Sequence, residues 1–163
     1  MVQADLRQPL TLAHAVDAVL SVATLHWLPD HAAVFGTVAA ALRPGGQFIA
    51  ECGGCGNIET FRAALREVSG ADGAEIWNFA DVQETTANLR KAGFTDIAVR
   101  LVPDAARLEG GEQLEAFIAT VMLSAQLREM PVKDRRPFVH EVAQRLPEPV
   151  IDYVRLQISA VRA

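Results

Sequence analysis

The chain has 163 residues, a length typical of one domain; half of its residues are apolar and 21% are charged. Eight prolines and eleven glycines keep the composition within the globular range, which excludes a disordered chain and a collagen-like repeat. Fifteen basic and twenty acidic residues leave a net charge of −5. This balance argues against a duplex nucleic acid as partner, because phosphate binding needs clustered Lys and Arg.

The first residues and the two cysteines indicate the cellular compartment. Gln3, Asp5 and Arg7 give no signal-peptide pattern, and no apolar run approaches the ~20 residues that span a bilayer. Cys52 and Cys55 are too few and too close together for a secreted disulfide framework. We therefore expect a cytoplasmic protein without a membrane partner, folded as a single domain over residues 1–163.

The first predicted elements form a strand–helix–strand unit. Residues 15–25 (AVDAVLSVATL) are mostly small and apolar, which is typical of a strand covered on both faces in a parallel sheet. Asp30 is a good helix N-cap, and the apolar residues after it repeat at helical spacing. Residues 43–46 (RPGG) end that helix, and residues 47–52 (QFIAEC) predict a second strand. Short right-handed connections make the two strands parallel.

The middle of the chain predicts two further helices and a strand. A glycine-rich loop over residues 53–56 precedes Asn57, which we expect to cap a helix. Asp81 with Glu84 three residues later predicts the start of another helix, and Gly93 its end. Residues 94–102 (FTDIAVRLV) alternate as a third strand. The apolar positions expected on the first of these helices are Phe61, Ala64, Leu65 and Val68.

The last third predicts two helices and a final strand. Apolar residues mark helices over residues 114–122 and 138–146, and residues 153–161 (YVRLQISAV) alternate as a fourth strand. Strands interleaved with helices predict an α/β fold, a sheet with flanking helices.

Several tracts together resemble one enzyme family. Residues 17–28 (DAVLSVATLHWL) and 40–51 (AALRPGGQFIAE) resemble the fourth strand, the following helix and the fifth strand of class I S-adenosylmethionine-dependent methyltransferases. Residues 53–58 (GGCGNI) resemble the GGxGN segment of the trans-aconitate methyltransferase-like branch. Residues 77–94 and 152–160 resemble that branch's tract before the sixth strand and its last strand.

The resemblance also indicates what this chain lacks. Family members carry a glycine-rich loop after their first strand and an acidic residue at the end of their second, and neither pattern occurs here. The chain therefore resembles the C-terminal portion of such an enzyme, a partial Rossmann-like sheet. With the family order 3-2-1-4-5-7-6, the expected remaining strands are 4-5-7-6.

The resemblance implies a set of site residues. Asp5 and Leu6 would contact the adenine of S-adenosylmethionine. The alternative for Asp5 is a solvated acid near a frayed terminus. Ser21, Val22 and Ala23 end the strand where ligands bind in open α/β sheets, or are ordinary small residues of a buried strand.

The substrate is expected near His26 and Trp27. His26 could donate to a substrate carboxylate or act as a base, and Trp27 could position the substrate or belong to the core. Methyl transfer to a carboxylate needs no base, because the nucleophile is already ionised. A binding role for His26 is therefore favoured over a catalytic one, and a small carboxylic acid is the expected substrate.

Cys52 and Cys55 form a C-x-x-C pattern. Zinc needs four ligands, and no second pair supplies the rest, so we expect no metal. A thioredoxin-like redox pair near a helix start is an alternative to two ordinary cysteines of the GGxGN tract.

Two functions from different classes follow. The first is an S-adenosylmethionine-dependent methyltransferase of a small acid, with doubtful activity in this chain alone. The second is a non-catalytic remnant that acts as an interaction module. If the first half of the sheet is missing, the strand over residues 15–25 becomes an apolar edge, and such edges pair with another chain. We then expect a homodimer through residues 16–23, with the two strands antiparallel across a two-fold axis.

Overall fold

The computed structural model describes residues 3–10 and 12–163, which fall into two compact units. We call the first the sheet unit: among the described residues it comprises 3–10, 12–57, 75–103 and 154–163. The second, the helical unit, comprises residues 58–74 and 104–153.

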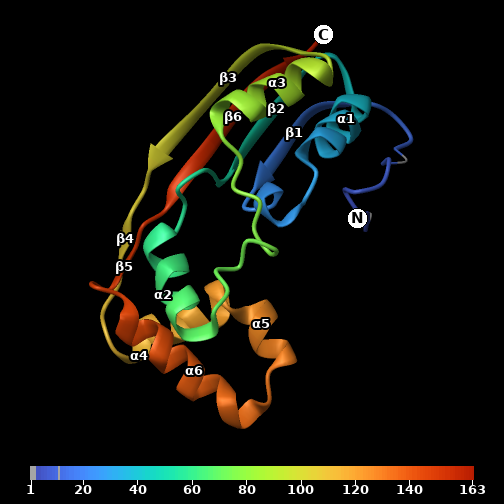
Figure 1. Ribbon diagram of the computed structural model, residues 1–163. Helices are drawn as coiled ribbons and strands as arrows, with labels where there is room; N and C mark the ends of the chain where they lie inside the picture. The colour runs from blue at the N-terminus through green and yellow to red at the C-terminus, as the bar shows by residue number, and fades with distance from the viewer. Residues whose placement is uncertain (1–2, 11) are drawn as a thin grey trace. The chain divides into compact units, whose positions relative to one another are not determined.

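The sheet unit is built on four strands in the order β1-β2-β6-β3 (Figure 1). These strands are β1 (Val16–Val22), β2 (Leu42–Gly53), β3 (Phe94–Pro103) and β6 (Val154–Arg162). β1 runs parallel to β2, and β6 lies antiparallel between β2 and β3. All four strands and the expected order 4-5-7-6 are confirmed, and β1 lies at one edge of this sheet.

One face of the sheet carries the core. Alternate residues of β2 and β6 point to this face, where α1 (His31–Ala41) and α3 (Val82–Lys91) pack (Figure 1). Phe48 lies between Phe35 and Phe94, with ring centroids 6.0 and 5.8 Å away. The fully buried side chains of this core include Phe35, Phe48, Leu89 and Leu156.

The opposite face of the sheet is exposed. Leu20 is 73% exposed, Val22 60% and Ile49 41%. The expectation that the strand at residues 15–25 is covered on both faces is therefore wrong for the described chain. β1 is an edge strand, and the helices that pack on the core, α1 and α3, lie against the other face.

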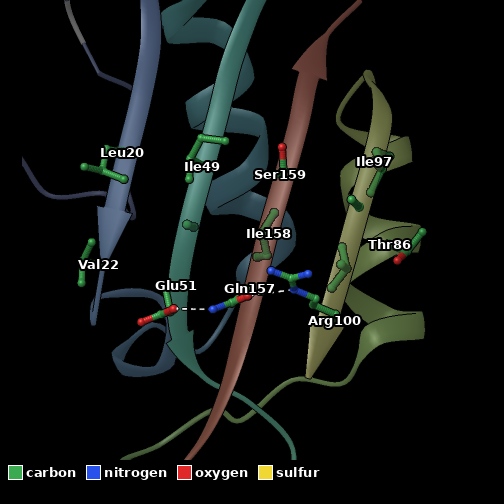
Figure 2. A pocket seen from close by; sticks show the side chains of 13 residues that line it. Leu20, Val22, Ile49, Glu51, Thr86, Ile97, Arg100, Gln157, Ile158 and Ser159 are labelled. Carbon is green, nitrogen blue, oxygen red and sulfur yellow. Dashed lines mark hydrogen bonds between the residues drawn. The ribbon is translucent and has the colours of Figure 1, made fainter. Parts of the chain in front are cut away.

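A polar row crosses this open face next to the apolar side chains (Figure 2). Gln157 of β6 donates to Oε2 of Glu51 at 2.8 Å, and Nε of Arg100 donates to Oε1 of Gln157 at 2.8 Å. The strand register aligns the three residues with Val22 at the edge. A shallow hollow of about 660 Å³ lies over this face.

The predicted helix starts are partly confirmed. Asp30 accepts from the N–H of Ala33 at 3.0 Å, and Asp81 from that of Glu84 at 2.7 Å. The expectation that Asn57 caps α2 (Glu59–Ser69) is wrong. Ile58 occupies the cap position with φ 52°, and Asn57 is turned to β6 instead.

The helical unit holds α2, α4 (Glu112–Phe117), η2 (Ile118–Met122), α5 (Ser124–Glu129), α6 (Val132–Arg145) and the short pair β4 (Ala106–Arg107) and β5 (Val150–Ile151). The helix expected over residues 114–122 is confirmed, with a π-helical second half; α5, β4 and β5 were not predicted. α2 packs on α6. Over the described residues, no helix combines the length and apolar character needed to cross a membrane.

Candidate functional site

The candidate site lies where β1 ends and the chain leaves the sheet. Ala23 has φ 53°, a left-handed conformation that non-glycine residues rarely adopt, and its N–H donates to the carbonyl of Glu51 at 2.8 Å. The short 3-10 helix η1 (Leu25–Trp27) follows at once. The sharp turn at Ala23 therefore places His26 and Trp27 at the carboxyl edge of the parallel strands, where open α/β sheets bind ligands.

His26 is held by two distant segments of the sheet unit. Its Nδ1 accepts a hydrogen bond from the backbone N–H of Gly53 at 3.1 Å, and its carbonyl accepts from the N–H of Asn78 at 2.9 Å. Because Nδ1 accepts, the proton of the neutral ring lies on Nε2. Burial, helped by the charges of Arg155 and His31, lowers the pKa of His26 to about 4. The ring is therefore a neutral Nε2–H donor at pH 7.

An aromatic cluster surrounds His26. The centroids of Trp27 and Phe79 lie 5.1 and 6.0 Å from the imidazole centroid, and Trp77 stacks on Phe79 at 6.1 Å with planes 8° apart. Trp27 is 45% exposed, so its reading as a core residue is wrong, whereas Trp77 is buried. Trp77 and Phe79 were not identified as site residues. Their only sequence signal is their place in the tract that resembles the family.

The residues expected to bind a cofactor are only partly brought together. Leu6, Ser21 and Val22 line a hollow of about 200 Å³, and Oγ of Ser21 is buried with no hydrogen-bond partner in the part of the chain that the structure describes. Ala23 forms the turn beside it. Asp5 is not among the residues that line this hollow: its carboxylate binds Arg7 at 2.8–3.1 Å, and this hydrogen bonding lowers its pKa to about 2.

The two cysteines differ in environment. Cys52 is buried, and that burial raises the pKa of its thiol to about 12, so it stays protonated and unreactive. Cys55 is exposed, and both thiols are free. A buried, protonated Cys52 does not suit the redox alternative. Within residues 3–10 and 12–163, no group of three or more His, Cys, Asp or Glu side chains could hold a metal ion.

Part of the chain is similar in sequence to known methyltransferases. Residues 1–50 match a family model described as a methyltransferase domain. An uncharacterized methyltransferase of Schizosaccharomyces pombe is 31% identical over 94 residues, which cover 50% of this chain and 36% of that protein. This chain thus spans about a third of that curated relative.

Solved structures share the fold at low sequence identity. The YcgJ protein of Bacillus subtilis matches 99% of this chain and 70% of its own, with a TM-score of 0.63 and 10% identity. A Bacillus halodurans protein assigned to the methyltransferases matches 98% and 70%, with a TM-score of 0.57 and 14% identity. Phosphoethanolamine N-methyltransferase 2 of Haemonchus contortus, solved with S-adenosylhomocysteine, matches 90% and 33%, with a TM-score of 0.50 and 18% identity.

The fold is therefore a Rossmann-like α/β fold, which the chain shares with solved structures that include proteins described as methyltransferases. The family match over residues 1–50 and the curated relative are similarities to methyltransferases over part of this chain.

Proposed function

We propose that this chain provides the substrate side of an S-adenosylmethionine-dependent methyltransferase that acts on a small carboxylic acid. The observation that supports the proposal most directly is the state of His26, a neutral ring with Nδ1 engaged by Gly53 and a proton on Nε2. Such a ring donates a hydrogen bond to an oxygen of the substrate. It takes up a proton poorly at neutral pH, so it is a weak general base.

Because His26 is a weak base, it suits methyl acceptors that need no deprotonation. A carboxylate with an ordinary pKa near ~4 is ionised at pH 7 and needs no base, whereas amines, alcohols and phenols must lose a proton. S-adenosylmethionine, when bound, supplies an electrophilic methyl group on a sulfonium. Transfer to a carboxylate would form an O–C bond as the C–S bond broke and left its electron pair on sulfur, so no proton would have to move. His26 and Trp27 then serve to place the acid.

The proposed cofactor contacts are Ser21, Val22, Ala23 and Leu6. Ser21 fits this role because its buried hydroxyl has no partner among the described residues and faces a hollow. At about 200 Å³ the hollow is smaller than the ~300–1,000 Å³ of complete ligand pockets. These residues therefore fit part of the cofactor. Asp5 would reach the adenine amino group only after its carboxylate leaves Arg7.

The first test is a calorimetric titration of S-adenosylhomocysteine into the 163-residue chain, up to millimolar ligand. We expect weak one-to-one binding, and several-fold weaker binding for Ser21→Ala because the orphaned hydroxyl is lost. Ser159→Ala, on the open face of the sheet, is the matched control and should bind as the parent does. Absence of heat and of thermal stabilisation would contradict a cofactor site in this chain.

The second candidate function is an interaction module without catalysis. It is favoured by the position of β1, whose residues 16–22 form one edge of the sheet with exposed apolar side chains. Two copies would pair their strands over residues 16–23, antiparallel across a two-fold axis.

Light scattering over a range of protein concentrations tests this homodimer. The dimer predicts twice the chain mass of 17.6 kDa, and a single mass of 17.6 kDa at high concentration contradicts it. Ala18→Lys, which adds a charge to the exposed edge, should favour the monomer. Thr95→Lys on β3, at the opposite edge, is its control. Dimers that bind no S-adenosylhomocysteine would favour this candidate over the enzyme.

A further inference from the structure

We propose that the loop over residues 53–57 (GGCGN) is a positioning element that holds the His26 ring as an Nε2–H donor, with Asn57 as the residue that fixes the loop. The catalytic meaning of this inference rests on the proposed function. The geometry itself can be tested without any ligand. The loop was expected from the sequence as part of a family tract, with no role assigned to it.

Both glycines at the start of the loop are needed for close packing. A Cβ on Gly53 would lie 2.6 Å from Nδ2 of Asn57 and 2.7 Å from a ring carbon of Phe79. A Cβ on Gly54 would meet Leu101 and would lie 2.8 Å from Cβ of Leu156. Real Cβ atoms do not make such contacts, so the loop reaches this position only without side chains at 53 and 54.

Asn57 fastens the loop to the neighbouring strand. Its side chain is 4% exposed, and Oδ1 accepts from the N–H of Val154 in β6 at 2.8 Å. The N–H of Gly54 donates to the carbonyl of Val154 at 2.9 Å, and the N–H of Cys55 to that of Ala80 at 3.0 Å. The loop is thus held from two sides, by β6 and by the segment before α3.

Held in this way, the loop directs the backbone N–H of Gly53 at His26. Gly53 is the last residue of β2, and its N–H is 3.1 Å from Nδ1 of the imidazole. A free imidazole exchanges between two neutral tautomers and titrates near pH ~6.5. With the Gly53 N–H on Nδ1, only the Nε2–H form is compatible with the site. The charged and titratable groups that act on the ring are Arg155 and His31.

A fixed His26 ring keeps its Nε2–H pointing in one direction. A ring that flips or exchanges its proton presents a donor to the substrate only part of the time, whereas a fixed ring presents it continuously. Asn57 would therefore act on the substrate through Gly53 and His26. This makes Asn57 and Gly53 positioning residues.

The experiment is nitrogen NMR of the whole chain labelled with 15N-histidine, compared with Asn57→Ala and Asn57→Asp. His26→Gln identifies the His26 signals among those of the four histidines. In the parent we expect the Nε2–H tautomer and a titration midpoint near 4. Asn57→Ala should give mixed tautomers and raise the midpoint by about 1 pH unit or more. Asn57→Asp keeps an oxygen that can accept from Val154 and should therefore keep the Nε2–H tautomer of the parent.

One control variant and two possible contradicting outcomes accompany this experiment. Thr60→Ala, in the helical unit, removes a side-chain hydrogen bond of similar kind and should leave the His26 signals unchanged. A parent ring that carries its proton on Nδ1 overturns the proposal without any variant, even if Asn57→Ala does not fold. A folded Asn57→Ala with unchanged tautomer and midpoint overturns it as well. Absence of S-adenosylhomocysteine binding bears on the proposed function and leaves this geometry standing.

Discussion

Asp152 caps helix α2 from 92 residues away: its Oδ2 accepts from the N–H of Thr60 at 2.9 Å and from the Thr60 hydroxyl at 2.8 Å. Replacing Asp152 by Ala leaves the first turn of α2 without this acceptor and should cost about 1–2 kcal/mol of unfolding free energy. Asp152→Asn keeps an oxygen acceptor and should cost less than half as much. Urea unfolding measures both.

Glu148 offers the control for the Asp152 prediction. Its carboxylate pairs with Arg107 at 2.6 Å, but both side chains are more than half exposed. Exposed pairs contribute about 0–1 kcal/mol, so Glu148→Ala should change stability little. If Asp152→Ala were no more destabilising than Glu148→Ala, the cap on α2 would have no energetic importance.

Helix caps show how far sequence reasoning extends in this chain. Asp30 and Asp81 were predicted because a cap and its helix are neighbours in the sequence. Asn57 looked like a cap by the same rule, but its partner is Val154, 97 residues away, and the α2 cap comes from Asp152. Contacts between distant residues leave no local pattern, so the sequence could not reveal them.

Some residues of the candidate site could likewise be expected from the sequence, and others could not. His26 was expected at the site because it follows the strand at which the family that the sequence resembles faces its substrate. Trp77 and Phe79 lie some fifty residues further along the chain, and the fold brings them to His26 and Trp27. The exposure of Leu20 was missed for a related reason. An apolar run predicts a strand, but whether its faces are covered depends on elements elsewhere.

The two faces of the sheet should respond differently to substitution. Phe48 is fully buried against α1, and Phe48→Ala should cost about 3–5 kcal/mol of unfolding free energy. Leu20 is 73% exposed on the other face, and Leu20→Gln should change stability by less than about 0.5 kcal/mol. Chemical denaturation at low protein concentration measures both. A large cost for Leu20→Gln would mean that another chain covers this face.

The left-handed turn at Ala23 predicts a specific order of stability. Its φ of 53° strains any residue with a side chain by about 1–2 kcal/mol, and glycine escapes that strain while losing more chain entropy. Ala23→Gly should therefore be neutral or stabilising by up to about 1 kcal/mol, whereas the β-branched Ala23→Val should cost about 2 kcal/mol or more. Thermal unfolding ranks the three proteins.

Ala18 provides the control for Ala23. It lies in β1 with extended backbone and an exposed side chain, where valine is well tolerated. Ala18→Val should therefore leave the melting temperature unchanged or slightly raised. Equal effects of valine at positions 18 and 23 would contradict a strained turn at the end of β1.

The lowered pKa of His26 predicts how stability changes with pH. The folded chain keeps the ring neutral down to about pH 4, whereas the unfolded chain protonates it below its ordinary value of 6.5. Between these values the unfolded state binds more protons, so this contribution to stability is complete above pH 6.5 and is lost as the pH falls towards 4. Because the ring is only partly buried, the loss should be on the order of 1–2 kcal/mol.

His26→Gln isolates that contribution. The variant cannot titrate at position 26, so the difference in unfolding free energy between parent and variant should be larger at pH 7 than at pH 4.5. Urea unfolding at both pH values measures the difference, and His14→Gln, at an exposed position, is the control variant. A parent–variant difference for His26 that does not change with pH would mean that the ring titrates alike in the folded and unfolded chain. The Gly53 N–H would then not hold it as a neutral donor.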